Sequence, residues 1–325
     1  MKPLVIITRK LPQIIENRMS ELFDVRLNDD DHIFSDMELR RAVGEADILV
    51  PTVTDRIDAD ILASAGENLR MIANYGVGVD HIDLRSARNR MITVTNTPGV
   101  LTEDTADMAV ALMLGITRRL GEGERTLRAG KWKTWAPTGM LGMRLNDKNL
   151  GIVGMGRIGE AVAVRAKALG LNIHYHNRNQ LEEVTESWLD ATYWSSLDQM
   201  ITQMDIISLN CPSTPDTRHI MSKRRLSLMQ PHSYLINTAR GVVVDEGALI
   251  DALQNNKIAG AGLDVYENEP HVDTRLFELE NAMIVPHMGS ATDEARAAMG
   301  EKVMINIKTF VDGHSPRDRV LAEGF

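Results

Sequence analysis

Residues 149–159 read NLGIVGMGRIG, a short apolar run followed at once by the pattern GxGxxG. In this pattern the first glycine, Gly154, permits a tight turn, and the second, Gly156, lets backbone N–H groups approach a pyrophosphate. The third, Gly159, lets the next helix pack close to the strand. The N-terminus of that helix would add unpaired N–H groups and a partial positive charge. The stretch therefore predicts a strand, a dinucleotide-binding turn and a helix.

The sequence after the glycines has the spacing of a helix and then of a second strand. Apolar residues recur at helical intervals over 158–169, and Gly170 stands where a C-terminal cap is expected. Residues 172–176 then read as a strand. A glycine-rich turn alone can also connect two elements without a ligand. The βαβ pattern around this one favours the dinucleotide site over a purely structural turn.

The end of the second strand bears on which cofactor is bound. NAD-binding sites carry an Asp or Glu about 20 residues past the glycines, where it binds the adenosine ribose. Residues 176–179 read HNRN and contain no carboxylate. Arg178 could form a charge-assisted bond with a 2′-phosphate, which a carboxylate would repel. We therefore expect Asn177 and Arg178 to favour NADP(H), while NAD(H) use stays open. The alternative is that Arg178 is only a solvated loop charge.

The composition of the 325-residue chain is that of a globular protein with two domains. It is 43% hydrophobic and 25% charged, and 36 basic against 45 acidic residues give a formal net charge of −9. This balance, without a basic block, argues against nucleic acid or a membrane as a partner. The single cysteine, Cys211, allows no intrachain disulfide and suits a reducing compartment. No apolar run is long enough for a signal peptide or a membrane span, so we expect a cytoplasmic protein.

Strand-like runs and helical patterns alternate along the chain, which is typical of parallel sheets with crossover helices. Strands are expected at residues 4–8, 46–52, 71–74, 92–96, 206–210, 233–237, 261–265 and 282–285. Helices are expected at residues 12–22, 36–43, 102–115 continuing toward 127, and 293–311.

We expect an α/β protein with two doubly wound parallel-sheet domains. Residues 100–288 would form a Rossmann dinucleotide-binding domain. It would be inserted into a flavodoxin-like substrate domain made of residues 1–99 and 289–325. A cleft between the two domains would hold the substrate beside the nicotinamide.

Three polar residues follow strand-like runs in the second half of the chain. Arg240 lies in NTARG, Glu269 in ENEP and His287 in VPHMGS. The carboxyl ends of parallel strands form the edge at which open α/β sheets bind ligands. Each residue alone has an ordinary interpretation: a surface charge, a turn residue before proline, or a hydrogen-bonded histidine. Together, behind a dinucleotide site, they form a coherent set for hydride transfer.

These residue types suit the reduction of a 2-keto acid. The planar guanidinium of Arg240 can bind the carboxylate and polarise the neighbouring carbonyl. Negative charge grows on the carbonyl oxygen as hydride arrives, and histidine can deliver the proton because it titrates near neutral pH. A carboxylate bound to the other ring nitrogen would orient the imidazole and favour its protonated form. We therefore expect His287 to be the acid and Glu269 its partner.

Motifs over nearly the whole chain resemble those of the D-isomer-specific 2-hydroxyacid dehydrogenases. These motifs are NYGVGVDHID (74–83), NTPGVLTE (96–103), the GxGxxG unit, CP (211–212), NTARG (237–241), GLDV (262–265) and PHMGS (286–290). By this resemblance Arg240, Glu269 and His287 match the catalytic trio of the family. Asp264 matches the residue that holds the nicotinamide carboxamide, and Thr105 would lie beside the cofactor.

The resemblance also implies binding residues for substrate and cofactor. Backbone N–H groups of Tyr75, Gly76, Val77 and Gly78 would bind the substrate carboxylate, together with Arg240. The residues that would bind the cofactor are Thr105, Gly154, Gly156, Arg157, Ile158, Gly159, Asn177, Arg178, Cys211, Pro212, Thr238, Ala239, Asp264 and Gly289. Cys211 would be a packing residue rather than a nucleophile. No metal is expected.

Within the family the chain looks most similar to glyoxylate and hydroxypyruvate reductases. The pair Asn74-Tyr75 and the stretch GKWKTW (130–135) carry this similarity. It implies a small 2-keto acid substrate. The resemblance to the family as a whole implies a homodimer joined through the nucleotide-binding domain. Trp132 and Trp135 would cap the substrate pocket, or would simply be interface or core aromatics.

Several alternatives stay open at this point. The substrate could be a larger 2-keto acid such as 2-ketogluconate. The fold is also shared by NAD(H)-sensing corepressors, which bind partner proteins and keep the catalytic residues. Formate dehydrogenases carry glutamine where Glu269 stands, and phosphoglycerate dehydrogenases often add a regulatory domain for which 325 residues leave no room.

Overall fold

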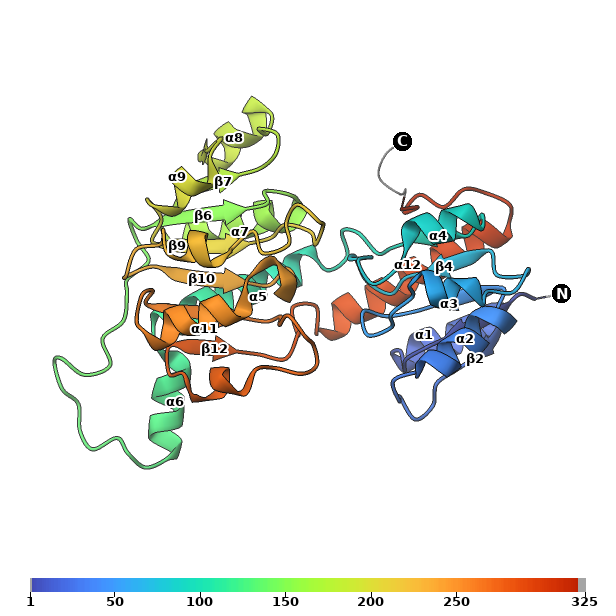
Figure 1. Cartoon of the computed structure of the whole chain (residues 1–325), viewed down its shortest axis with the longest axis horizontal. Helices are drawn as coiled ribbons and strands as arrows, with labels where there is room; N and C mark the ends of the chain where they lie inside the picture. Colours follow the sequence, from blue (N-terminus) through green and yellow to red (C-terminus); the bar gives the residue numbers. More distant parts are fainter. Residues whose placement is uncertain (1, 321–325) are drawn as a thin grey trace. The chain divides into compact units, whose positions relative to one another are not determined.

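The computed structural model of the chain describes residues 2–320 and divides into two compact units (Figure 1). Unit 1 comprises Met1–Leu101 and Ser290–Phe325, and unit 2 comprises Thr102–Gly289. Each unit contains one sheet in which every strand pair is parallel. The expected fold class, α/β with two parallel-sheet domains, is therefore confirmed.

Unit 1 contains a five-stranded sheet with the order β2-β1-β3-β4-β5, which is the order of flavodoxin-like folds. Its strands are β1 (Leu4–Ile7), β2 (Asp24–Arg26), β3 (Ile48–Val50), β4 (Met71–Ala73) and β5 (Thr93–Thr95). Its helices are α1 (Gln13–Leu22), α2 (Asp36–Glu45), α3 (Ala59–Ala63), α4 (Leu84–Asn89) and α12 (Asp293–Val311). Strands β3 and β4 are entirely buried, as expected for apolar runs covered on both faces.

Unit 2 contains a seven-stranded sheet with the order β12-β11-β10-β9-β6-β7-β8. Its strands are β6 (Asn149–Val153), β7 (Asn172–His176), β8 (Ala191–Tyr193), β9 (Ile206–Leu209), β10 (Tyr234–Asn237), β11 (Gly260–Leu263) and β12 (Ala282–Ile284). Its helices are α5 (Thr102–Thr117), α6 (Leu120–Arg128), α7 (Arg157–Ala168), α8 (Glu183–Leu189), α9 (Leu197–Ile201), α10 (Lys223–Leu226) and α11 (Glu246–Gln254), with 3₁₀ helices η1 (Gly241–Val243) and η2 (Thr274–Glu278).

The order of strands in unit 2 reverses at β6, whose neighbours are β7 and β9. Two hydrophobic clusters cover the sheet. One includes side chains of α5 and α7, and the other includes side chains of α9, α10 and α11. In such doubly wound sheets the crevice at the strand-order reversal, outside the carboxyl ends of the strands, is where nucleotides bind.

The helix expected from residue 102 toward 127 is in fact two helices. Helix α5 ends at Thr117 and α6 begins at Leu120. Between them Arg119 has a φ of 54°, a left-handed conformation that cannot continue a right-handed helix. The strands β2 and β8 and several short helices were not predicted, because each spans so few residues that it carries little periodicity.

Helix α6 and the segment after it extend away from the sheet of unit 2 (Figure 1). No side chain of α6 is buried. Leu127, Trp132 and Trp135 are 63%, 60% and 76% exposed. This exposure excludes the interpretation of the two tryptophans as core residues of the chain itself. We call α6 with residues 129–148 the arm.

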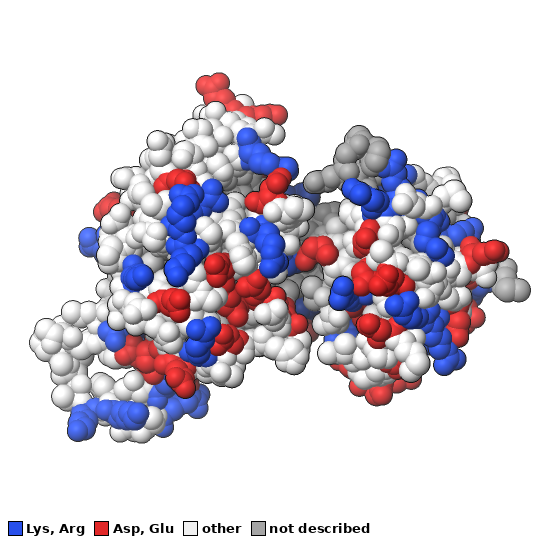
Figure 2. Space-filling model, in the orientation of Figure 1, with Lys and Arg blue, Asp and Glu red and all other residues white. Residues whose placement is uncertain are grey.

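Acidic and basic side chains are interspersed on the visible face of both units (Figure 2). Within residues 2–320, no helix combines the length and the apolar character needed to cross a bilayer. The same residues contain no group of three His, Cys, Asp or Glu side chains that could hold a metal ion.

Candidate active site

The residues of unit 2 that the sequence singled out collect at the carboxyl edge of its sheet. Gly154 directly follows β6, and Asn177 directly follows β7. Cys211 lies two residues after β9, while Thr238 and Asp264 directly follow β10 and β11. Because all these strands are parallel, their ends meet on one edge, which is where open α/β sheets bind ligands.

The glycine-rich turn is packed tightly on one side and open on the other. Gly154 has a φ of 96°, and a Cβ there would lie 2.7 Å from the backbone nitrogen of Cys211. A Cβ at Gly159 would lie 2.4 Å from the carbonyl oxygen of Gly154, whereas one at Gly156 would meet nothing within 4 Å. Helix α7 begins right after Gly156, and no side chain caps its N-terminus. Free N–H groups beside open space fit a phosphate group.

Two buried polar atoms at this edge have no hydrogen-bond partner within the described residues. They are Asn210 Oδ1 and Thr238 Oγ1. Buried polar groups are nearly always paired, so such atoms point to a polar ligand or water at the edge. Cys211 is also buried, and burial raises the pKa of its thiol to about 11. The thiol therefore stays protonated at neutral pH and is a poor nucleophile.

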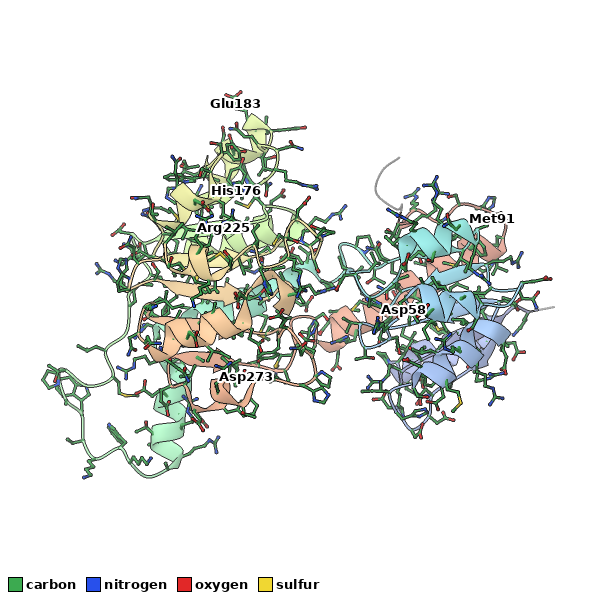
Figure 3. All side chains as sticks on the ribbon, in the orientation of Figure 1. Asp58, Met91, His176, Glu183, Arg225 and Asp273 are labelled. Atoms are coloured by element: carbon green, nitrogen blue, oxygen red, sulfur yellow. The ribbon has the colours of Figure 1, made fainter. Side chains whose placement is uncertain are left out.

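Asn177 and Arg178 have different environments at the end of β7, whose last residue is His176 (labelled in Figure 3). The side chain of Asn177 accepts a hydrogen bond from the Met155 N–H (2.7 Å) and donates one to the Met155 carbonyl (3.2 Å). Asn177 thus fastens the glycine turn to the end of β7. The Arg178 side chain is exposed and has no partner in residues 2–320. It is the residue of this pair whose charge is available to a ligand.

His287 and Glu269 form a hydrogen-bonded pair. His287 Nδ1 lies 2.6 Å from Glu269 Oε2, and Glu269 Oε1 accepts the Tyr266 N–H at 2.9 Å. The other ring nitrogen, Nε2, has no partner in the part of the chain that the structure describes. Burial raises the pKa of the Glu269 carboxyl. This effect is outweighed by the hydrogen bond to His287 and the charge of His287, by the Tyr266 N–H and by the charge of Arg240, all of which lower the pKa. The pKa of Glu269 is therefore below its usual range, and the carboxylate stays ionised where imidazoles titrate.

Asp264 holds the turn that carries His287. Its backbone carbonyl accepts the His287 N–H (2.8 Å), and its carboxylate accepts those of Met288 (2.6 Å) and Gly289 (2.8 Å). Burial raises the pKa of this carboxyl above its usual range, although these N–H groups oppose the shift. The turn needs such support because His287 has a φ of 48°. Thr105 lies beside it, since a Cβ on Gly289 would be 3.5 Å from Thr105 Cγ2.

Arg240 is held by a turn of its own, which touches the segment before Glu269. Asn237 Nδ2 donates to the Arg240 carbonyl (2.8 Å), and its Oδ1 accepts the Ala239 N–H (3.0 Å). A Cβ at Gly241 would lie 1.8 Å from the carbonyl carbon of Tyr266. The two turns are therefore in direct backbone contact, and the structure brings the three expected catalytic residues to one region of unit 2.

The turn of residues 75–78 belongs to unit 1, and asparagine side chains bind three of its backbone carbonyls. Asn74 Nδ2 donates to the carbonyls of Gly76 (3.0 Å) and Gly78 (2.9 Å), and Asn96 Nδ2 donates to that of Val77 (2.8 Å). The N–H groups of these three residues donate to no acceptor within residues 2–320. Three successive carbonyls are thus bound within unit 1, whereas the N–H groups remain available to a ligand such as an anion.

Tyr75, which the sequence placed among the substrate-binding residues, is fully engaged within unit 1. Its N–H donates to the Pro51 carbonyl (2.9 Å), and its hydroxyl donates to the Arg296 carbonyl (2.5 Å). Burial raises the pKa of the hydroxyl to about 12. Tyr75 therefore anchors the turn, and the donors available to a ligand come from the three residues that follow it.

Three asparagines that shape these turns were not predicted as functional. Asn237 carries a detectable local signal, because an asparagine that accepts the N–H two residues ahead is a common turn device. Asn74 and Asn96 act on the same turn from positions 22 residues apart, and no local pattern connects them.

Comparison with known proteins identifies the family. Residues 110–289 match the family described as D-isomer specific 2-hydroxyacid dehydrogenase, NAD binding domain. The chain is 44% identical over 324 residues to a glyoxylate reductase of Thermococcus litoralis, covering 98% of this chain and 97% of the relative. The chain belongs to the D-isomer-specific 2-hydroxyacid dehydrogenases. It is therefore an NAD(P)-dependent oxidoreductase, and the family and enzyme class expected from the sequence are confirmed.

Solved structures of other D-2-hydroxyacid dehydrogenases have the same fold. A putative member from Polaromonas sp. superposes with a TM-score of 0.91 at 36% identity, covering 98% of this chain and all of that one. An NADPH-dependent glyoxylate/hydroxypyruvate reductase of Sinorhizobium meliloti, in complex with NADP and malonate, superposes with a TM-score of 0.87 at 33% identity, covering 98% and 97%. A D-2-hydroxyacid dehydrogenase needs a nicotinamide site and a proton donor, and the sheet edge of unit 2 offers features suited to both.

Proposed function

We propose that this D-2-hydroxyacid dehydrogenase reduces a small 2-keto acid of the glyoxylate or hydroxypyruvate kind to the D-2-hydroxy acid, and that it prefers NADPH. The observation that carries the proposal is the hydrogen-bonded pair of His287 and Glu269 at the sheet edge that also bears Arg240. The names of the relatives from Thermococcus litoralis and Sinorhizobium meliloti support the substrate class.

The chain's own residues account for the handling of charge and proton. The bound nicotinamide supplies the hydride. Arg240 binds the keto acid and polarises its carbonyl, which stabilises the negative charge that develops on oxygen. His287 donates the proton from Nε2 to that oxygen, since its Nδ1 is occupied by Glu269. The ionised carboxylate of Glu269 fixes the orientation of the ring through Nδ1.

A panel of substrates tests the proposal. NADPH consumption should be measured with glyoxylate, hydroxypyruvate and 2-ketogluconate, and each should be repeated with NADH. We expect the highest kcat/KM with one of the two small acids. Higher activity with 2-ketogluconate would contradict the substrate class. No turnover with any 2-keto acid, together with tight NADPH binding, would instead favour a sensing role.

The exposed Arg178 supports the preference for NADPH. If its guanidinium binds the 2′-phosphate, Arg178→Ala should lower kcat/KM for NADPH by about 10- to 100-fold, the loss of one charge-assisted hydrogen bond. The value for NADH should stay unchanged, because NADH has no 2′-phosphate. Arg224→Ala, which removes another exposed arginine of unit 2, is the matched control. Equal effects of Arg178→Ala on both cofactors would contradict this assignment.

We propose that the backbone N–H groups of the turn at residues 76–78 bind the substrate carboxylate. Asn74→Asp removes the amide donors and places a negative charge beside the carbonyls of Gly76 and Gly78. The KM for the keto acid should rise by about tenfold or more, as expected when buried hydrogen bonds are lost. The KM for NADPH should not change. Asn17→Asp, an exposed position on α1 of the same unit, is the control, and an unchanged KM in Asn74→Asp would refute the proposal.

We infer that two copies of the chain associate through the arm. The exposed apolar side chains of Leu127, Trp132 and Trp135, all within nine residues of the arm, support this, because exposed large apolar side chains that gather on one segment commonly mark an interface. A sedimentation mass of one chain, 36.1 kDa, at micromolar concentration would contradict it.

A further inference from the structure

We propose that Glu267 is a positioning residue for the reaction: with His219 and Glu246 it fixes the segment that carries Glu269 against the segment that carries Arg240. This inference rests on the proposed function, because it concerns how the trio is placed. Glu267 lies on the same loop as Glu269, between β11 and η2, but its side chain has other partners.

The side chain of Glu267 forms a second carboxylate–imidazole pair. Its Oε1 lies 2.8 Å from His219 Nε2 and 3.4 Å from a guanidinium nitrogen of Arg218. The side chains of Glu267 and His219 are 19% and 33% exposed, so the bond between them is partly shielded from water, whereas that of Arg218 is 60% exposed. A hydrogen bond in such a setting holds its partners more firmly than one on an open surface.

His219 is in turn bound to the segment that follows Arg240. The His219 N–H donates to the carbonyl of Val242 in η1 (2.9 Å), and η1 begins directly after Arg240. His219 therefore binds the Glu269 loop through its ring and the Arg240 turn through its backbone. Its φ of 49° is a conformation that few side chains adopt, which indicates that the local structure enforces this orientation.

Glu246 makes the second connection between the two segments. It lies in the first turn of α11, the helix that follows η1, and its Oε2 accepts the Glu267 N–H at 3.0 Å. Burial raises the pKa of the Glu246 carboxyl. Glu267 is thus held through its side chain by His219 and through its backbone by Glu246. The Glu267 carboxylate itself makes no hydrogen bond to His287 or Glu269.

This arrangement matters because the rate of proton and hydride transfer depends strongly on geometry. A displacement of about 1 Å at a reacting group can cost about 100-fold in rate. The contact between Gly241 and Tyr266 sets how closely the two segments approach. The hydrogen bonds of Glu267 restrict the relative displacement of the two segments. They therefore restrict the position of Glu269 relative to Arg240.

The test is a double-mutant cycle with Glu269. Glu267→Ala should lower kcat by about 10- to 100-fold, while the KM for NADPH stays unchanged. Glu267→Gln should restore most of the activity, because its amide oxygen can still accept the bond from His219. In a Glu269→Ala background, Glu267→Ala should cause no further loss if it acts through Glu269. Multiplicative losses in the double mutant, or an unchanged kcat in Glu267→Ala, would overturn the inference.

Two further variants separate positioning from general loss of stability. His219→Asn tolerates the left-handed backbone but is too short to reach Glu267, so it should reproduce the loss of kcat. Asp198→Ala removes another ion-paired carboxylate, which binds Arg224 and Arg225, and should leave kcat unchanged. Of these residues, Figure 3 labels Arg225. If the unaltered chain turned over no 2-keto acid, the proposed function would fail; if it did and His219→Asn were fully active, only this inference would fail.

Discussion

Replacing His287 with alanine is expected to lower kcat by about 10²–10⁴-fold, the usual contribution of a positioned general acid. In the structure His287 Nδ1 is bound by the ionised Glu269 carboxylate, which leaves Nε2 to deliver the proton. The affinity for NADPH should change little, because His287 has no part in the glycine-rich turn. Steady-state kinetics and a fluorescence titration with NADPH measure the two effects separately.

The backbone at His287 calls for a second variant. Its φ of 48° strains alanine but is tolerated by asparagine, so His287→Asn should show the same loss of turnover with better retained stability. His314→Ala, at an exposed histidine of unit 1, should be fully active. If either His287 variant kept most of its turnover, the assignment of the proton donor would be wrong.

The pH dependence should reflect the lowered pKa of Glu269. A carboxyl whose folded pKa is depressed keeps its charge as the pH falls through the ordinary range of glutamate, about 4.3, and loses it only below that. The support that Glu269 gives to the imidazole should therefore persist on the acidic side of the profile.

Replacing Arg240 with lysine is expected to lower kcat/KM for the keto acid by about 100-fold or more. Lysine keeps the charge but loses the planar pair of donors that binds carboxylate and carbonyl together. Two charge-assisted hydrogen bonds contribute about 1.5–3 kcal/mol each, and 1.36 kcal/mol corresponds to a factor of ten. The turn itself should survive, because Asn237 holds the backbone of Arg240 rather than its side chain.

The control for Arg240→Lys is Arg275→Lys, at an arginine paired with Asp273 near the end of the same domain. It should have wild-type kinetics. In Arg240→Lys the KM for NADPH should also be unchanged, which would localise the defect to the keto acid. An Arg240→Lys enzyme with full kcat/KM would show that a point charge is sufficient and would contradict bidentate binding.

Much of the fold was predictable because its signals are local. The strands β1 and β3 are continuous apolar runs, β6 and β9 are mostly apolar, and α12 has the bounds expected from its sequence, Asp293–Val311. The glycine pattern by itself predicts the turn at Gly154, since the spacing of the three glycines is contained within six residues. The break at Arg119 was missed, because helical spacing continues across it while the backbone does not.

The residues of the candidate site also divide into those with a local sequence signal and those without one. Arg240, Glu269 and His287 were predicted because each follows a strand-like run in the sequence. The bonds that hold their turns were not predicted. The Met288 and Gly289 N–H groups donate to Asp264, and the Glu267 N–H donates to Glu246, across 21 to 25 residues of sequence. The sequence also does not show which polar atoms are already hydrogen-bonded within the protein. The Tyr75 hydroxyl, for example, donates to the Arg296 carbonyl because of tertiary packing.

The discontinuity of unit 1 has a consequence for how the chain acquires its structure on the ribosome. Helix α12 packs against α1 and β4, and its Gly300 is so close to Ile15 that a Cβ would lie 2.6 Å from that side chain. The first hundred residues therefore emerge without the helix that covers their apolar face, and they receive it only after all of unit 2 has been translated. Unit 2 is one continuous segment and can fold during that interval. In the nascent chain, unit 2 would therefore finish folding before unit 1.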